Sequence, residues 1–312
     1  DYTRALSLSR LAYDLESLVS PMLAAVMLSL VSYHWLFTGT VVGFVASALL
    51  IAPLVLPSVP QDRPRSFRDR LTRGGRIYLA TPRLRGLLAL VLTAAAAGAF
   101  VIVNTVVIVR SHFGGNDSDV AMALGAFGAG SMVAALTLPR ALDRRGDRSI
   151  MLAGGAALTM LLLGTSLCFG TSSGPPWVVL LCLWTAMGLA YSAVLTPSGR
   201  LLRRSSQAAD RPALFTAQFA LSHICWLLTY PLAGQAMTHW GAAPALASLG
   251  VLALGGVALA AMLWPPGDPE ILPHSHADLP SDHPHLRAHS GPVHTHAFVI
   301  DDCHHNWPNH RE

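Results

Sequence analysis

The residues of this chain best suited to chemistry are histidines near its C-terminal end. Ten of the fourteen histidines follow Pro273, with several standing two apart or adjacent. The paired residues are His274 and His276, His283 and His285, His294 and His296, and His304 and His305. Side chains two apart in an extended segment point the same way, so each such pair offers two imidazoles to one ion. Imidazole suits Ni(II), Zn(II), Cu(II) and Co(II), so we expect this tail to bind a divalent metal.

The sequence predicts that the tail, residues 265–312, is a disordered, histidine-rich segment. Its prolines disfavour a fixed fold. It has no Cys-x-x-Cys spacing of the kind found in closed zinc sites. We therefore expect several weak sites, with binding that fades below about pH 6 as the imidazoles become protonated. A regulatory or incidental extension is the alternative.

Upstream of the tail, the chain is strongly apolar. Hydrophobic residues make up 52% of the 312 positions and charged residues only 12%, which is outside the range of soluble domains. Eight stretches reach the roughly 20 residues needed to cross a bilayer. They are residues 11–31, 35–56, 86–109, 119–139, 150–170, 176–196, 212–236 and 243–264. The predicted fold class is all-α, a polytopic membrane helical bundle with about eight transmembrane helices.

The positions of the basic residues predict the orientation in the membrane. All 21 are arginines, concentrated in segments 57–85, 140–148 and 200–211, which alternate with arginine-poor connections. Arginine-rich loops stay in the cytoplasm, so both ends of the chain are predicted to be cytoplasmic, in an inner (plasma) membrane. The net charge of +4 therefore reflects topology, and nucleic acid is not an expected partner.

Segment 57–85 divides the chain. Its apolar residues are interleaved with arginines, a pattern suited to an anionic membrane surface, although a solvated linker is the alternative. The predicted order is two helices of an incomplete N-terminal bundle (1–56), a basic cytoplasmic linker (57–85), a six-helix bundle (86–264) and the tail (265–312).

The loop after the fourth span resembles a family motif. The stretch from Arg140 to Arg148 is similar to the Gly-x-Leu-x-Asp-Arg-x-Gly-Arg-Arg loop of the major facilitator superfamily, with Asp143, Arg144, Gly146 and Arg148 matching. That family places this loop between the second and third helices of each six-helix half, and here it follows the second helix after the linker. The resemblance implies a partial major facilitator fold, with the loop acting in conformational change.

The residues of this loop also have physical roles of their own. Gly146 would allow a tight turn between antiparallel helices. Asp143 could accept charge-assisted hydrogen bonds from arginines or from a helix N-terminus. Replacing Asp143 by asparagine is therefore expected to impair conformational switching, whereas an ordinary basic turn would tolerate the change.

The first span carries a second resemblance. The stretch from Glu16 to Ala25 is similar to the Gly-x-x-x-Gly-Pro-x-x-Gly-Gly pattern in the fifth helix of antiporter branches, and it retains Pro21. Glu16 replaces the first glycine. The resemblance implies that the eight spans correspond to helices five to twelve. Four helices would then precede this chain, and the chain alone is not expected to transport.

Polar residues within the spans are candidates for a transport cavity, because such groups usually face a cavity or a partner. The candidates are Asp14, Glu16, Asn104, Gln218, His223, Trp226 and Tyr230. The first two would couple transport to protons or cations, with an interfacial position near Arg10 as the alternative. The last three share one helix face, and His223 would titrate near neutral pH. Interhelical hydrogen bonding is the alternative for Asn104 and His223.

The histidine-rich tail is similar to those of the nickel-resistance branch of the superfamily. This resemblance implies a secondary active transporter, a proton-coupled exporter of a divalent metal such as nickel or cobalt. Efflux of small amphipathic organic compounds and a non-transporting, membrane-anchored metal sensor or scaffold are the alternatives. The sequence shows no nucleotide-binding loop or nucleophile arrangement, so we do not expect an enzyme or a required cofactor. The expected partners are the lipid bilayer and a small solute or metal ion.

Overall fold

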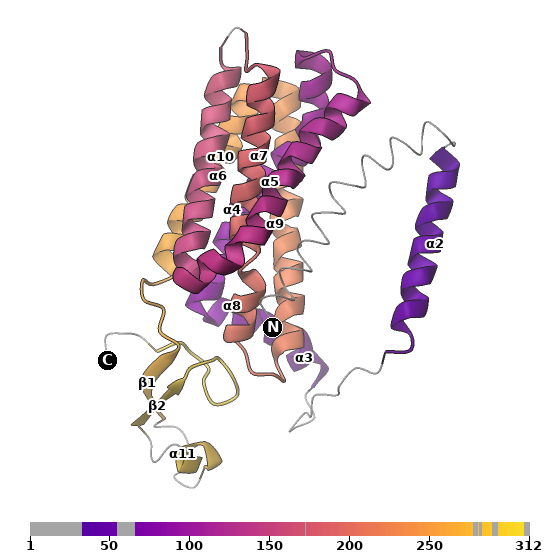
Figure 1. Cartoon of the computed structure of the whole chain (residues 1–312). Coiled ribbons are helices and arrows are strands. Elements are labelled where there is room, and N and C mark those ends of the chain that lie inside the picture. Colours follow the sequence, from indigo (N-terminus) through magenta and orange to yellow (C-terminus); the bar gives the residue numbers. More distant parts are fainter. Residues whose placement is uncertain are drawn as a thin grey trace.

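The computed structural model describes residues 33–54, 66–171, 173–276, 280, 283–288 and 293–308. The predicted first span lies outside these residues, as do Asp14 and Glu16. The described chain forms a helical bundle with a small two-stranded sheet at one end (Figure 1). The helices are α2 (Tyr33–Ile51), α3 (Phe67–Ala80), α4 (Pro82–His112), α5 (Asp117–Arg144), α6 (Asp147–Phe169), α7 (Trp177–Leu195), α8 (Ser198–Arg204), α9 (Arg211–Trp240), α10 (Ala242–Leu263) and α11 (Pro284–Ala288). The strands are β1 (Ile271–Ser275) and β2 (Val293–Ala297).

Six helical segments of the described chain are long and apolar enough to cross a membrane. They are α4, α5, α6, the combined segment of α7 and α8, α9 and α10. They match the six spans predicted after the linker, so the predicted class of polytopic membrane helical bundle is confirmed. Helix α2 has a shorter apolar stretch, Phe37–Ile51, and stands apart from the bundle with exposed side chains (Figure 1).

Helix α4 occupies the centre of the bundle. It packs against α6, α7, α9 and α10, and its side chains are buried over most of its length. The run Thr93–Ala99 is made almost entirely of alanine and glycine, and such small residues allow neighbouring helices to approach closely. Three hydrogen bonds tie α4 to its neighbours. They join Thr93 Oγ1 to Ala253 O on α10 (3.1 Å), Asn104 Nδ2 to Ala233 O on α9 (3.1 Å) and Trp184 Nε1 on α7 to Thr105 Oγ1 (2.8 Å).

Glycines bring α5 and α7 into direct backbone contact. A Cβ atom built on Gly130 would lie 1.9 Å from the carbonyl oxygen of Thr185, and one built on Gly188 would lie 1.8 Å from that of Phe127. No side chain fits at either distance, so these two positions set how closely the helices approach.

The arginine-rich segments that the structure describes gather at one end of the bundle. Figure 1 shows α3, α8, β1 and β2 at this end, which we call the arginine-rich end. The connections from α4 to α5, from α6 to α7 and from α9 to α10 lie at the opposite end (Figure 1). The alternation of loops along the sequence is therefore seen in space, while the cytoplasmic assignment of this end stays a prediction.

The predicted basic linker contains helix α3. Ser66 caps its start by accepting a hydrogen bond from the backbone N–H of Asp69 (3.2 Å). The helix packs on the beginning of α9, where a Cβ on Gly74 would lie 2.0 Å from the carbonyl oxygen of Ala213. Arg73 on this helix is buried against the protein, which the amphipathic pattern did not predict.

The tail differs from the disordered segment that the sequence predicted. Strands β1 and β2 pair antiparallel, with His274 opposite His294. Leu272, Phe298 and Ile300 are buried in the same hydrophobic core as the membrane helices. The burial of this apolar surface offsets the entropy lost on ordering, an effect that the proline content does not reveal.

The contact between α5 and α7 yields a testable prediction. Replacing Gly188 by alanine should force the two backbones apart and destabilise the protein by about 1–3 kcal/mol. Replacing Gly164 by alanine is the matched control, because no atom lies within 4 Å of its Cβ position. Thermal unfolding in detergent should show a lower midpoint for Gly188→Ala alone; equal midpoints for the two variants would contradict the close contact.

Candidate functional site

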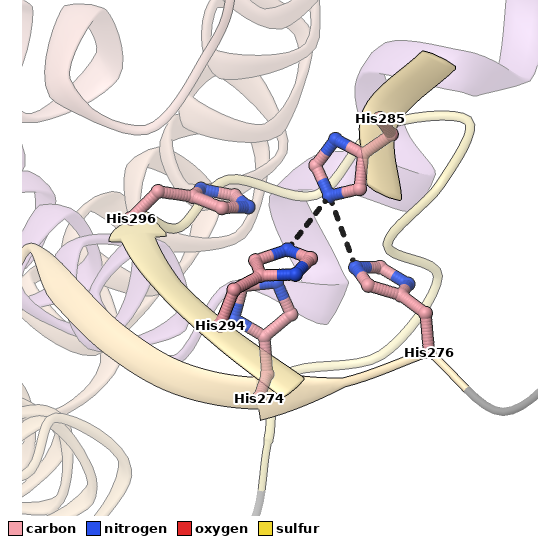
Figure 2. Close-up of side chains that lie close together, drawn as sticks. All are labelled: His274, His276, His285, His294 and His296. Carbon is pink, nitrogen blue, oxygen red and sulfur yellow. Dashed lines mark hydrogen bonds between the residues drawn. The ribbon is translucent and has the colours of Figure 1, made fainter. Parts of the chain in front are cut away.

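Five histidines of the tail converge on one point (Figure 2). They are His274, His276, His285, His294 and His296. Each offers one ring nitrogen, and these atoms all lie within 4.8 Å of one another. We call this group the histidine cluster. It is a single gathering of imidazoles, whereas the sequence predicted several separate weak sites.

The antiparallel register explains why the two pairs meet. His274 and His276 are two apart, so they point to one face of the hairpin, and the same holds for His294 and His296. Because His274 lies opposite His294, the two pairs share that face. Helix α11 lies over it and adds His285 (Figure 2). Local spacing created the pairs, and strand pairing assembled them.

The ring nitrogens stand at the spacing of metal ligands. His285 Nε2 lies 3.1 Å from His276 Nε2 and 3.0 Å from His294 Nε2. One ring nitrogen is either protonated or carries a lone pair, so it cannot donate to one neighbour and accept from the other. With metal–nitrogen bonds of 2.0–2.1 Å, neighbouring ligands lie roughly 2.8–3.4 Å apart. A divalent ion would satisfy this arrangement.

His304 extends the cluster, while two other predicted ligands lie outside it. His304 Nε2 is 3.1 Å from His274 Nε2, and its Nδ1 is 2.8 Å from Asp301 Oδ1, a carboxylate that orients the ring. His305 is exposed. His283 Nδ1 accepts a hydrogen bond from the backbone N–H of His285 (3.3 Å) and so shapes the turn before α11.

Burial favours the neutral form of three imidazoles in the cluster, those of His274, His276 and His285. Desolvation by burial, followed by repulsion among neighbouring histidines, lowers the pKa of His274 and of His285 to about 4. The pKa of His276 is lowered by the same causes. Metals bind the neutral form of imidazole, so at neutral pH these rings are ready for ligation.

A buried ion pair fastens the arginine-rich end. Arg73 of α3 donates two hydrogen bonds to Asp210, with distances of 2.6 Å from Nε to Oδ1 and 2.9 Å from Nη2 to Oδ2. Both residues are almost fully buried, at 3% and 2% exposure. Arg73 also pairs with Asp302 of the tail. No local sequence pattern predicts this site, because its residues are far apart in the chain.

Asp268 joins the start of the tail to the bundle. It accepts hydrogen bonds from Arg204 of α8 and from Trp264 Nε1 (3.0 Å), and it lies 3.6 Å from Arg83 Nη1. Arg83 is buried and stacks over the ring of Trp307, 4.9 Å from its centroid. Both ends of the tail are therefore anchored to the arginine-rich end.

The loop that resembles the family motif uses a different carboxylate from the expected one. Asp143 is exposed and makes no ion pair with another described residue. Asp147 is buried, accepts hydrogen bonds from Arg200 (2.9 Å from Nε) and lies 3.9 Å from Arg204 Nη1. Asp147 stands at the first position of α6, where the helix dipole stabilises a negative charge. This position makes Asp147 a better partner for the arginines than Asp143.

Of the other loop residues, one has a clear role and two do not. Arg148 donates to the carbonyl oxygens of Trp264 (2.7 Å) and Ala261 (3.2 Å), which end α10. Gly146 precedes α6 with φ −63°, and a Cβ there would meet no atom within 4 Å, so the expected need for glycine is not seen. Arg144 is exposed.

A sequence comparison identifies the family. Residues 86–298 match the profile of the Major Facilitator Superfamily. The chain belongs to this superfamily. A search among curated proteins finds no matching relative. Members of the superfamily are transporters, so this chain is a secondary transporter, and membership favours transport over enzymatic catalysis.

The intramembrane candidates of this superfamily member divide into two groups. Asn104 is buried in the seam between α4 and α9, as its alternative interpretation predicted. Gln218 accepts a hydrogen bond from the hydroxyl of Tyr78 (2.5 Å) and ties α9 to α3. Both side chains therefore join helices.

The remaining candidates lie along one side of α9. His223 is exposed, with Nδ1 2.8 Å from the carbonyl oxygen of Phe219. The rings of Trp226 and Tyr230 contact each other, with centroids 5.0 Å apart and planes tilted by 31°, and the Trp226 ring fills the space beside Gly98. Of the described candidates, His223 and Tyr230 are the ones with exposed side chains.

The ion pairs of the loop generate a prediction. Changing Asp147 to asparagine leaves Arg200 without its charged partner and should lower the free energy of unfolding by about 1–3 kcal/mol. Asp143→Asn is the matched control and should be neutral to within about 0.5 kcal/mol, because the residue is exposed. Thermal unfolding of the two variants checks this, and a larger loss from Asp143→Asn would contradict the assignment.

The lowered histidine pKa values predict a pH-dependent tail. Folded-state values near 4 lie below the ordinary value of about 6.5, so protonation favours the opened tail. The stabilisation is complete above about pH 6.5 and is lost as the pH falls towards about 4. His276, His294, His296, His304 and Asp301 face these groups. Metal-free hydrogen exchange, corrected for intrinsic rates, should show β1 and β2 losing protection over this range while α10 keeps it. Constant protection in the strands would refute the prediction.

Proposed function

We propose that the native protein is a proton-coupled exporter of a divalent metal ion such as nickel or cobalt. The observation that carries the proposal is the histidine cluster docked at the arginine-rich end. A set of neutral imidazoles suits these borderline ions better than calcium or magnesium, which prefer oxygen ligands. In a transporter, such a cluster is suited to binding the substrate ion before transport.

The side of the membrane is part of the proposal. Arginine-rich segments favour the cytoplasm, so the cluster would face the compartment from which an exporter takes its substrate. The cluster lies outside the membrane helices, so it would concentrate or sense the ion without forming the path through the bilayer.

The path itself needs other groups. In the described membrane helices, carboxylates occur only in the first and last turns, at Asp117, Asp119, Asp143 and Asp147. We propose that Asp14 and Glu16 supply the coupling carboxylates and that His223 adds a ligand from α9. Proton exchange at such carboxylates would drive the ion outwards.

A second candidate function has one observation in its favour. Trp226 and Tyr230 form a tilted aromatic pair on α9, the helix that also carries His223. Aromatic faces bind amphipathic organic compounds and organic cations, so efflux of such compounds is the alternative. A non-transporting metal sensor or scaffold would use the cluster alone.

Flux measurements test these functions. Everted membrane vesicles containing the native protein, energised so that the lumen is acidic, should accumulate Ni(II) or Co(II). A protonophore should abolish this accumulation. Glu16→Gln should reduce it at least about tenfold if this carboxylate carries the coupling proton, because each lost charge interaction of about 1.4 kcal/mol is a factor of ten. Asp117→Asn, in an exposed first turn, is the matched control.

Each alternative has its own outcome in the same vesicles. Accumulation of ethidium without Ni(II) or Co(II) would overturn metal export in favour of organic efflux. A protein that moves none of these probes but binds Ni(II) through its tail would instead be a sensor.

A further inference from the structure

We propose that the histidine cluster is one closed site for a single divalent ion, and that the bound ion clamps the tail onto α3 and the start of α9. The inference rests on the metal assignment of the proposed function but not on transport. Metal binding by the tail would then stabilise the contacts at the arginine-rich end.

The ligands favour one closed site because they come from three separate elements. His274 and His276 come from β1 and its end, His285 comes from α11, and His294 comes from β2. The Nε2 atoms of His276 and His294 both approach His285 Nε2, at 3.1 and 3.0 Å. An ion held between them would join both strands to α11, and these contacts form only when all three elements are in place (Figure 2).

The first connection to the bundle runs through His304. Its ring contacts His274 on one side and Asp301 on the other. Asp301 also accepts hydrogen bonds from the backbone N–H groups of Cys303 and His304. Its Oδ2 accepts from Gln207 Nε2 (2.7 Å), in the connection between α8 and α9. Ordering the cluster therefore orders a turn that is bonded directly to the bundle.

The second connection uses the next carboxylate. Asp302 pairs with Arg73 of α3, which holds Asp210 at the beginning of α9. Arg73 is buried while Asp302 is exposed, so this contact brings the tail to an otherwise internal ion pair. Phe298 and Trp307 add an apolar contact, at 5.1 Å between ring centroids. The metal site and the helix ends are thus linked by a short, continuous series of contacts.

The stoichiometry of Ni(II) binding tests the closed site. The full chain in lipid nanodiscs should bind one tight ion in equilibrium dialysis. The triple variant His276→Ala/His285→Ala/His294→Ala should lose that ion. The matched control His239→Ala/His305→Ala removes two exposed histidines outside the cluster and should retain it. Several equivalent weak ions, or tight binding that survives the triple change, would overturn the single site.

Hydrogen exchange tests the clamp. An ion that binds only the docked tail should lower the population of the open tail, and with it the exchange rate of the strand amides, about 100-fold at a Ni(II) concentration 100 times its Kd. The protection should extend to α3 and to residues 207–214. The variant Gln207→Ala/Asp302→Asn removes both connections and leaves every cluster histidine in place. It should still bind one Ni(II), more weakly than the native chain because docking and binding are coupled, and it should lose the added protection of α3.

Two results would refute the clamp independently of the single site. Saturating Ni(II) that protects the strands but leaves α3 and residues 207–214 unchanged would refute it. If the double variant does not fold, the single variant Gln207→Ala should show a smaller metal-dependent protection of residues 207–214 than the native chain, and full protection there would equally refute the clamp. These measurements involve no flux. Their outcome therefore does not depend on whether the protein exports metal in vesicles.

Discussion

The bundle depends on one constraint: polar groups within apolar spans must find their partners inside the protein. Helix α4 shows how this is met. Its Thr93, Thr105 and Asn104 form hydrogen bonds with α10, α7 and α9 respectively. Small residues around them allow the close approach that makes these bonds short. The same closeness is reached between α5 and α7 at Gly130 and Gly188, where backbone meets backbone.

The constraint also explains the character of the arginine-rich end. Charges are costly within the spans, so they collect where the helices end, and there three of the acidic residues are paired. Asp147, Asp210 and Asp268 each bind arginines from another part of the chain. This layer forms the surface on which the tail docks. Arg204 contacts both Asp147 of the family loop and Asp268 of the tail, so the two regions have an ion-pair partner in common.

Membership of the Major Facilitator Superfamily gives the histidine cluster its functional context. The cluster sits outside the membrane helices yet is held to their ends by apolar contacts and ion pairs. This position suits a metal-responsive element of a transporter. The described spans themselves offer few polar groups, because Asn104 and Gln218 are used in packing. If the proposed metal export holds, recognition of the ion would rest chiefly on the tail and on residues outside the described helices.

The sequence by itself determined the features that depend on neighbouring residues. Apolar runs predicted the six spans after the linker, arginine alternation predicted which loops gather, and residues two apart predicted the histidine pairs. Tertiary structure decided which of these groups meet. Strand register united the pairs into one cluster, the position at the start of α6 gave the ion pairs to Asp147 instead of Asp143, and a contact between distant segments buried Arg73 against Asp210. The physical reason is that periodicity is local, whereas pairing and burial depend on segments that only the folded chain brings together.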